Sequence, residues 1–302
     1  MAFVSAIVCT RDRPHDLARA VQALLDPPTA DIELIVIDQS DGPEAERILR
    51  ERFPDPRLVY QRSTSRGKGA ALNQGLRAAR GEFVVCTDDD CEAPPDWIVG
   101  MGRVLEAAPA VAIAFCNVVA GPYDPSQGYI PVFVRARKRV LTSIWDVREG
   151  LGLGAGMVVR RSVVLALGAF DEMLGPGSRF GSGDDWDISL RALIAGHQVL
   201  EIARLPVVHY GFRTFAQGRG HAMRDWIAIG ALCAKPVHAG YVGALVLSVR
   251  LFWLHALWPP ILDVLKLRRP SGAARITGFA KGFARGLATK LEPGTLRFRS
   301  NA

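Results

Sequence analysis

Four short apolar segments that alternate with helical patterns constrain the fold of this chain more than any other feature. The apolar segments lie at residues 3–10, 32–38, 57–61 and 82–87, and the helical patterns between them lie at 15–25, 43–53 and 69–80. Segments that are apolar on both sides are typical of strands with both faces buried. The alternation therefore predicts a parallel sheet covered by helices, which binds its ligand at the carboxyl ends of the strands.

The second half of the chain is more mixed. Strands are predicted at 110–119 and 155–160, a helix at 187–196, and short strands at 198–203 and 205–209. With 302 residues, the chain can bury the core of one large domain, or of one domain with an appendage. We expect an α/β fold with a mixed, mainly parallel sheet in residues 1–215 and a mainly helical region in residues 216–302.

Charge is distributed unevenly along the chain. The 37 Lys and Arg residues exceed the 30 Asp and Glu residues, and nine of the basic residues but only one acid follow residue 265. The body of the chain is therefore close to neutral, which argues against a nucleic-acid-binding protein. The basic tail alone is suited to an anionic surface, membrane or nucleic acid, and the apolar stretch before it favours the membrane.

The cysteines and the N-terminus indicate the compartment. The five cysteines form no C-x-x-C pair and most lie in apolar runs, which favours buried thiols in a reducing environment. The first residues, MAFVSAIVCTRDR, have no basic region before their short apolar run, so they predict a strand rather than a secretory signal. We therefore expect a cytoplasmic protein.

Residues 226–265 form an apolar, tryptophan-rich stretch. A membrane span needs about 20 uninterrupted apolar residues, whereas Lys235-Pro236, Arg250, His255 and Pro259-Pro260 interrupt this one. Helices that lie on a bilayer surface fit the pattern better than a single span.

A second amphipathic pattern follows in the basic tail. Its predicted helix has an apolar face and a basic face, made respectively by Ile276, Phe279, Phe283 and Leu287 and by Arg275, Lys281 and Arg285. Glycines at 278, 282 and 286 weaken this helix. The pattern fits a membrane-surface helix and, nearly as well, a tail that packs on the core or a dimer helix with a solvated basic face.

Three consecutive acids, Asp88 to Asp90, follow the fourth apolar segment. Side chains at positions i and i+2 of an extended segment point the same way, so Asp88 and Asp90 can converge on one divalent cation. The alternative is a helix N-terminus, where the helix dipole favours acids. One acid suffices for that role, so three acids favour a metal site.

A second acidic cluster and two isolated residues are further candidates. Asp184 or Asp185 could cap the following helix or act as a general base, because neighbouring carboxylates raise each other's pKa. Asp38 ends the second strand, where an acid accepts hydrogen bonds from a nucleotide base or ribose, although a turn-forming role is equally consistent. His209 has apolar neighbours, which is more typical of a core histidine than of a ligand.

One glycine pattern and several absent motifs complete this reading. Glycines at 152, 154 and 156 leave one face of their segment without side chains, which predicts either close backbone approach or a flexible loop. The chain has no G-x-G-x-x-G after the first strand, no Walker loop and no G-x-S-x-G elbow. Dinucleotide-binding, P-loop and α/β-hydrolase proteins are therefore disfavoured.

Five motifs follow one another along the chain. They are FVSAIVCTRDRP, IELIVIDQSDG, GKGAALNQGLRAARGEFVVCTDDDCEAPPDW, GAGMVVRRSVVLALGAFDE and GDDWDISLRALIAG. In this order and spacing they resemble the family 2 glycosyltransferases of the GT-A type. The resemblance covers residues 3–210 and implies a GT-A catalytic domain in residues 1–215.

The resemblance also implies residue roles. The nucleotide and donor site would contain Thr10, Arg11, Asp12, Asp38, Lys68, Asn73 and Asp89. Asp88 and Asp90 match the D-x-D motif that holds Mn²⁺ or Mg²⁺ on the donor diphosphate, and His209 is a further candidate ligand. Asp185 would be the catalytic base, supported by Asp184, which is one methylene shorter than the family's usual Glu. The reaction centre would be bordered by Gly154, Gly156, Met157 and Trp186.

The implied reaction is inverting transfer of a sugar from a nucleoside-diphosphate donor to a hydroxyl of a glycan or lipid-linked acceptor. Such an enzyme would act in cell-envelope polysaccharide or glycolipid synthesis at the cytoplasmic face of an anionic membrane. Its C-terminal region, 216–302, would associate with the membrane or form a homo-oligomer. A nucleotidyltransferase that makes sugar nucleotides is disfavoured, because no glycine occurs before Gly42 to form its phosphate loop. An inactive binding module is disfavoured by the presence of both acidic clusters.

Overall fold

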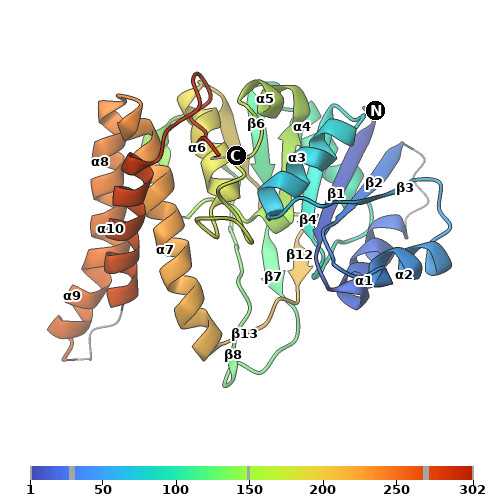
Figure 1. The fold of residues 1–302 in the computed structure, drawn as a ribbon, viewed down its shortest axis with the longest axis horizontal. Helices are drawn as coiled ribbons and strands as arrows, with labels where there is room; N and C mark the ends of the chain where they lie inside the picture. The colour runs from blue at the N-terminus through green and yellow to red at the C-terminus, as the bar shows by residue number, and fades with distance from the viewer. Residues whose placement is uncertain (1, 27–30, 148–149, 268–271, 301–302) are drawn as a thin grey trace.

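The computed structural model describes residues 2–26, 31–147, 150–267 and 272–300 (Figure 1). Its centre is an eight-stranded sheet in the order β3-β2-β1-β4-β10-β6-β11-β9. These strands are β1 (Val4–Thr10), β2 (Ile32–Asp38), β3 (Leu58–Arg62), β4 (Phe83–Asp88), β6 (Val111–Phe115), β9 (Arg139–Leu141), β10 (Met157–Arg160) and β11 (Gln198–Glu201). The first four strands are parallel, whereas β10 is antiparallel to both of its neighbours. The expectation of a mixed, mainly parallel sheet is confirmed.

Helices cover both faces of this sheet. The chain forms α1 (Pro14–Leu25), α2 (Glu44–Arg52), α3 (Lys68–Ala78), α4 (Trp97–Glu106), α5 (Arg161–Ala166) and α6 (Asp184–Ile194). Alternate residues of β2 divide between two cores: Leu34 and Val36 pack with α1, α2 and α4, whereas Ile35 and Ile37 pack with α3 and α6. Burial on both faces explains why the strand segments are almost wholly apolar.

Short elements extend the fold beyond the carboxyl edge of the main sheet. A three-stranded sheet contains β5 (Cys91–Glu92), β12 (Val207–His209) and β7 (Val118–Ala120), and β8 (Gly128–Tyr129) pairs with β13 (Arg213–Thr214). Two short 3-10 turns, η1 (Ile144–Asp146) and η2 (Gly154–Gly156), complete this part of the chain. The segment predicted as one strand at 110–119 therefore contributes to two different sheets, as β6 and β7.

The C-terminal region is helical, as expected. It consists of α7 (Phe215–His238), α8 (Val242–Leu251), the π-helical turn η3 (Phe252–Leu257), α9 (Trp258–Leu265) and α10 (Ala273–Ala288). In Figure 1 these helices stand side by side at one end of the sheet, with α10 along α7. Arg268 and Arg269 of the predicted basic tail lie outside the described residues.

The glycines of α10 are a packing face. A Cβ atom on Gly282 would collide with the carbonyl oxygen of Ile227 in α7, and one on Gly286 would lie 2.8 Å from the carbonyl oxygen of Ala231. The interpretation that these glycines merely weaken the helix was therefore incomplete, because they let two helix backbones approach closely. Phe279, on the predicted apolar face, is buried in the core, so the core-packing alternative describes α10.

A buried ion cluster joins the C-terminal helices to the α/β part of the chain. The ammonium group of Lys235 in α7 forms ion pairs with Asp171 and with Asp187 of α6, and all three side chains are buried. The carboxylate of Asp171 also accepts a hydrogen bond of 2.7 Å from the backbone N–H of Phe298. Lys235 thus interrupts the apolar stretch because it balances charge in the core.

The interruptions expected between 226 and 265 do not break the helix that follows α7. Lys235 and Pro236 belong to α7, and Pro259 and Pro260 lie at the start of α9, so a continuous helical run covers Val242–Leu265. By length and composition this run of 24 residues could cross a membrane, since an 18-residue window in it has a mean hydropathy of 1.5. Only 22% of that window is buried.

Candidate active site

The parallel register brings the predicted polar residues to one edge of the sheet. Thr10 lies opposite Asp38, and Cys9 lies opposite Asp88. Asp89 and Asp90 form the turn between β4 and β5, and the next helix, α4, begins only at Trp97. The alternative in which the three acids mark a helix N-terminus is therefore wrong.

Asp88 forms an ion pair with Lys68, the first residue of α3. The preceding residue, Gly67, has φ = +92°, a conformation that glycine adopts without strain. Burial by itself would lower the pKa of Lys68, but Asp88 and Asp184 raise it well above its usual value. A permanent cation therefore lies between the two acidic clusters.

Asp89 lies deeper in the same turn. Its carboxylate accepts hydrogen bonds from the hydroxyl group of Thr10, at 2.8 Å, and from Arg13, at 3.2 Å. Burial raises the pKa of Asp89 to about 6, although Arg13 opposes the shift. Arg13 also binds Asp90 at 3.0 Å. The sequence analysis missed Arg13, since TRDR offers Arg11 and Arg13 as equal candidates and only the turn before α1 selects between them.

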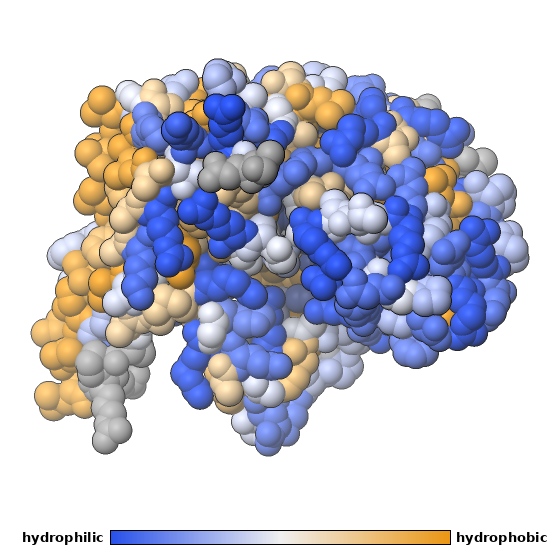
Figure 2. Space-filling model, viewed as in Figure 1, coloured by the Kyte–Doolittle hydropathy of each residue, from blue (hydrophilic) through white to orange (hydrophobic). Residues whose placement is uncertain are grey.

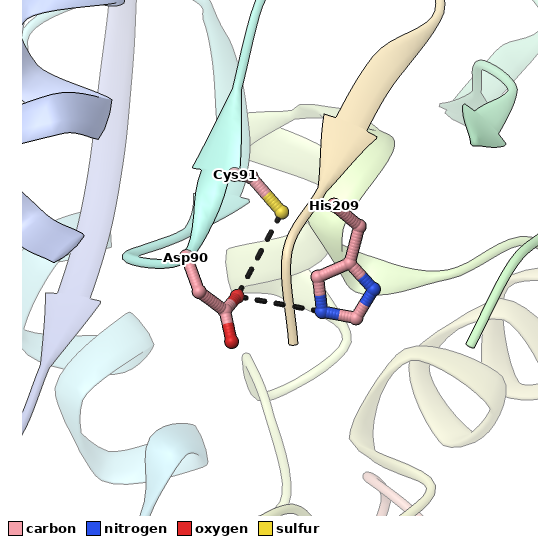
Figure 3. Close-up of side chains that lie close together, drawn as sticks. All are labelled: Asp90, Cys91 and His209. Carbon is pink, nitrogen blue, oxygen red and sulfur yellow. Dashed lines mark hydrogen bonds and ion pairs between the residues drawn. The ribbon is translucent and has the colours of Figure 1, made fainter. Parts of the chain in front are cut away.

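Asp90 faces His209, which β12 brings beside β5 (Figure 3). The Asp90 carboxylate lies 3.4 Å from Nε2 of His209, while Nδ1 lies 2.9 Å from the carbonyl oxygen of Pro131. Burial by itself would raise the pKa of Asp90, but His209 and Arg13 lower it to about 2. Since a carbonyl oxygen only accepts hydrogen bonds, Nδ1 carries a proton. Burial by itself would lower the pKa of His209, but Asp90 raises it above its usual value, so Nε2 is also protonated beside Asp90, and a bound cation would take the place of that proton.

This arrangement fits a divalent cation. Oxygen ligands from Asp90 and an imidazole nitrogen held by a carbonyl group are a common donor set for Mn²⁺. The third ligand atom in the cluster, Sγ of Cys91, also lies within 4.8 Å of the others, but burial raises the pKa of its thiol well above the usual range. Cys91 thus remains a protonated thiol, and Asp90 and His209 are the better ligands.

The backbone of Gly211 leaves room for such an ion. A Cβ atom at this position would lie 2.5 Å from Nε2 of His209 and 2.9 Å from a carboxylate oxygen of Asp90. Glycine at position 211 therefore keeps the space between His209 and Asp90 free of side-chain atoms. This role of Gly211 was not expected from the sequence.

Gly211→Ala is expected to weaken Mn²⁺ binding by about tenfold or more, because its methyl group would displace the imidazole of His209. The fold should be retained, since the nearest atom is the end of a side chain that can rotate. Calorimetric titration with Mn²⁺ measures the effect. Gly220→Ala, with nothing within 4 Å of the added atom, is the matched control, and equal Mn²⁺ affinity in both variants would contradict this placement.

The second acidic cluster begins α6. This helix starts at Asp184 rather than at 187, since Gly183 occupies the N-cap position with φ = +83°. The Asp185 carboxylate accepts hydrogen bonds of 2.8 Å from the backbone N–H groups of Gly154 and Trp186. Burial and the neighbouring Asp184 raise the pKa of Asp185 to about 7, against the effects of Lys68 and the two backbone donors. Such a carboxylate is suited to general base catalysis near neutral pH.

Gly154 explains how the two acidic clusters meet. A Cβ atom on Gly154 would lie 3.5 Å from both a carboxylate oxygen of Asp185 and Nζ of Lys68. Close backbone approach, one of the two readings of the glycine pattern, therefore describes position 154. Gly156 and Met157 do not reach this point: Gly156 packs against Cys116, and Met157 is buried in the core of the sheet.

The remaining predicted residues lie around the site or beneath it. Asp38 is 0% exposed, and its carboxylate accepts hydrogen bonds from the Ser40 N–H and from the hydroxyl group of Tyr60, both at 2.8 Å. Asn73 is also buried, and its amide binds the backbone of Phe170 and the carboxylate of Glu172.

Two of the predicted residues are exposed at the rim of the site, and a third, Trp186, directly follows the candidate base Asp185. Arg11 and Asp12 are exposed, and the backbone N–H of Asp12 donates to Ser40 at 2.8 Å. Trp186 is half-buried, with its ring beside Gly150. Asp38 and Asn73 thus support the loops of the site from below, while Arg11 and Asp12 are accessible.

The chain is similar in sequence and in fold to known proteins. The sequence model described as Glycosyl transferase family 2 matches residues 5–164. The succinoglycan biosynthesis protein ExoO of Rhizobium meliloti is 29% identical over 119 residues, which are 39% of this chain and 34% of that protein. The pre-mycofactocin glycosyltransferase of Mycobacterium tuberculosis is 27% identical over 240 residues, or 74% of this chain and 44% of that protein. The matches thus span about a third to somewhat under half of the relatives' length.

One solved structure shares the fold over nearly the whole chain. It is the mannosyltransferase PcManGT from Pyrobaculum calidifontis in complex with GDP-Man and Mn²⁺, with a TM-score of 0.63 and 18% sequence identity. The superposition covers 95% of this chain and 87% of that one. The architecture is therefore the GT-A fold, as the sequence motifs implied.

Proposed function

The chain belongs to glycosyl transferase family 2, and from this membership we propose that it transfers a sugar from a nucleoside-diphosphate donor to an acceptor hydroxyl. Transfer depends on Mn²⁺ or Mg²⁺ and inverts the anomeric configuration. The observation that carries the proposal is the approach of Asp185 and Lys68 to the backbone of Gly154, each 3.5 Å from a Cβ placed there. The candidate base Asp185 and Lys68, the cation that pairs with Asp88, thus both lie beside Gly154.

Each side chain then has a stated task. Asp185 accepts the proton of the acceptor hydroxyl as its oxygen attacks the anomeric carbon opposite the leaving diphosphate. The two backbone donors at Gly154 and Trp186 orient the Asp185 carboxylate for that step. A divalent ion, held by Asp88, Asp90 and His209, would neutralise charge on the leaving diphosphate, so no general acid is needed. Thr10, Arg13 and Lys68 hold the acidic turn in position.

A donor-hydrolysis assay tests this proposal against its alternatives. The protein is incubated with a panel of nucleoside-diphosphate sugars, with Mn²⁺ or with a chelator, and release of nucleoside diphosphate is measured. Release from one donor series that requires the metal supports the proposal. Tight donor binding without release under any condition would instead identify an inactive binding module. Release of pyrophosphate from a nucleoside triphosphate and a sugar phosphate would identify a nucleotidyltransferase.

The C-terminal helices support a further part of the proposal, which is contact with an anionic membrane. Residues 1–215 would be catalytic, and residues 216–302 would contain the surface that associates with the membrane. One side of the run Val242–Leu265 is apolar and exposed, and Figure 2 shows this as an orange band along the end of the molecule formed by α8 and α9. The exposed side chains of this band are Val242, Leu245, Val246, Val249, Trp253, Leu254, Trp258, Val264 and Leu265. Nine large apolar side chains exposed along one helical run are typical of an interaction surface.

The exposed band changes where membrane contact is proposed. Both the stretch 226–265 and the helix of the basic tail were expected to lie on a membrane surface, but the apolar face of α10 packs against α7. Arg250 lies on the exposed run, Lys266 directly follows it, and Arg275 of α10 donates to the carbonyl oxygen of His255 in the run, as expected for a helix on an anionic bilayer. A lipid-linked acceptor at the cytoplasmic face fits this surface.

Replacing Val246 and Val249 with aspartate is expected to weaken binding to vesicles that contain anionic lipid by at least about tenfold, because each buried valine contributes about 1.5 kcal/mol or more. The two valines are 55% and 59% exposed, so the fold should tolerate the change. Val132→Asp with Val134→Asp, at 51% and 57% exposure on another segment, is the matched control. Vesicle co-sedimentation measures both.

Two outcomes would contradict the membrane proposal. One is equal vesicle binding by wild type and by the variant with aspartate at 246 and 249. The other is a change from dimer to monomer in the same variant with no change in vesicle binding, which would assign the band to an interface between copies of this chain.

A further inference from the structure

The segment that enters α7 carries an unbalanced positive charge. Arg213, Arg219, His221 and Arg224 lie within twelve residues that contain no acid, and Asp225 follows directly. Within the described residues, none of the three arginines forms an ion pair with a carboxylate, whereas Arg13 binds two carboxylates. Cations without counter-ions repel one another unless an anion binds between them.

Arg224 is held in a defined position by packing. Its methylene carbons occupy the space beside Gly181, where φ is +76° and no side chain is present. One turn later, Ala228 lies 3.5 Å from a Cβ placed on Gly183. This face of α7 therefore lies against the loop that leads into α6 and its two aspartates. Arg224 is thus fixed by contacts of its stem, while Nε is buried without a hydrogen-bond acceptor among the described residues.

His221 adds a further donor to this group. Its Nδ1 lies 3.1 Å from Nη2 of Arg224, and a guanidinium group only donates, so Nδ1 accepts. Burial, followed by the charges of Arg213 and Arg224, lowers the pKa of His221, so the ring is neutral and its proton lies on Nε2. Every polar group that this cluster offers to a ligand is then a donor, which is the pattern of an oxyanion site.

We propose that Arg224, with His221 and Arg213, binds a phosphate group of the acceptor substrate. The inference rests on the proposed glycosyltransferase function and names the chemical class of its acceptor. The group packs on the loop 181–183, immediately before Asp184 and Asp185, whereas the donor diphosphate is assigned to Asp88, Asp90 and Lys68. Guanidinium groups bind phosphate through paired hydrogen bonds, and a phosphate monoester supplies up to two negative charges to this cluster.

The same phosphate chemistry could come from the donor diphosphate, and competition separates the two sources. Methyl phosphate is titrated into the protein by calorimetry, first alone and then with saturating nucleoside diphosphate and Mn²⁺. Binding that persists when the donor site is filled supports the proposal. Loss of methyl phosphate binding by competition, or no binding to the wild-type protein, would overturn it.

Arg224→Gln should weaken methyl phosphate binding by about tenfold or more, because a charged donor is lost. Arg224→Lys, which keeps the charge and most of the stem, should retain part of the affinity. Arg103→Gln changes an exposed arginine of α4 that has no carboxylate partner among the described residues, and it should bind as wild type does. Equal affinity in Arg224→Gln and Arg103→Gln would overturn the assignment.

Nucleoside diphosphate affinity with Mn²⁺ is measured in the same variants, so that failure of the phosphate site can be distinguished from failure of the proposed function. Retained nucleotide binding in Arg224→Gln with lost methyl phosphate binding supports an acceptor-phosphate site. If the wild-type protein binds no nucleoside diphosphate, the proposed function fails, while the titration with methyl phosphate alone still reports on the cluster.

Discussion

Replacing Asp185 with asparagine is expected to lower the rate of sugar transfer by about 10²- to 10⁴-fold, the usual contribution of a general base. The amide keeps the size of the carboxylate and one acceptor oxygen, so one of the two hydrogen bonds, from Gly154 or from Trp186, persists. What is lost is the ability to take a proton from the acceptor hydroxyl. Nucleoside diphosphate affinity should not change, and steady-state turnover with parallel calorimetry measures both quantities.

Asp16→Asn is a suitable control for Asp185→Asn. Asp16 is on α1 and is partly exposed, and its ion pair within the described part of the chain is with Arg19, one turn later, so its loss should not affect transfer. Normal turnover in Asp185→Asn would remove Asp185 from the mechanism. A parallel loss of nucleotide binding would show instead that the residue supports the donor site.

Replacing Asp90 with alanine is expected to abolish the metal dependence of donor binding. The Asp90 carboxylate accepts a hydrogen bond from Arg13 and faces His209. Its removal therefore leaves His209 without the neighbouring metal ligand and makes the net charge of the site more positive. Loss of a ligand should weaken Mn²⁺ binding by at least about 100-fold. Calorimetry with nucleoside diphosphate, with and without Mn²⁺, should then give the same affinity in both conditions.

Asp124→Ala, in an exposed loop, is the control for Asp90→Ala and should bind as wild type does. Asp88→Ala tests the other half of the D-x-D motif and should give the same loss. If Mn²⁺ still strengthens nucleotide binding in both Asp88→Ala and Asp90→Ala, the metal is held elsewhere.

The fold could be predicted because it depends on patterns that are local in the sequence. Apolar strands, amphipathic helices and polar residues at strand ends follow from burial of both sheet faces, and Leu34 to Ile37 illustrate this directly. The parallel register then places Thr10, Asp38 and Asp88 together. The acidic turn was therefore expected at the correct edge of the sheet.

The parts that could not be predicted depend on contacts between distant segments. Asn73 was assigned to the donor, but its amide is used by the backbone of Phe170, 97 residues away. Arg13 and Gly211 were missed because their relevance comes from the positions of Asp90 and His209 in space. Met157 has the right place in its motif, yet it lies in a central strand and is buried.

The C-terminal region shows a further limit of sequence patterns. Glycines in α10 lower helix propensity, but they also permit close packing on α7, and only the structure shows which effect matters. Likewise, Pro259 and Pro260 look like helix breakers, yet they lie just after the π-helical turn η3 and the helical run continues through them.

The central claim, metal-dependent binding of a nucleoside-diphosphate donor, is tested most directly by thermal unfolding of the wild-type protein. Each common nucleoside diphosphate is added with Mn²⁺, with a chelator, or alone. A ligand at 100 times its Kd stabilises the folded state by about 2.7 kcal/mol, which raises Tm by several degrees. We expect that one base series raises Tm and that Mn²⁺ is required. The absence of stabilisation by any nucleoside diphosphate, or equal stabilisation with the chelator, would contradict it.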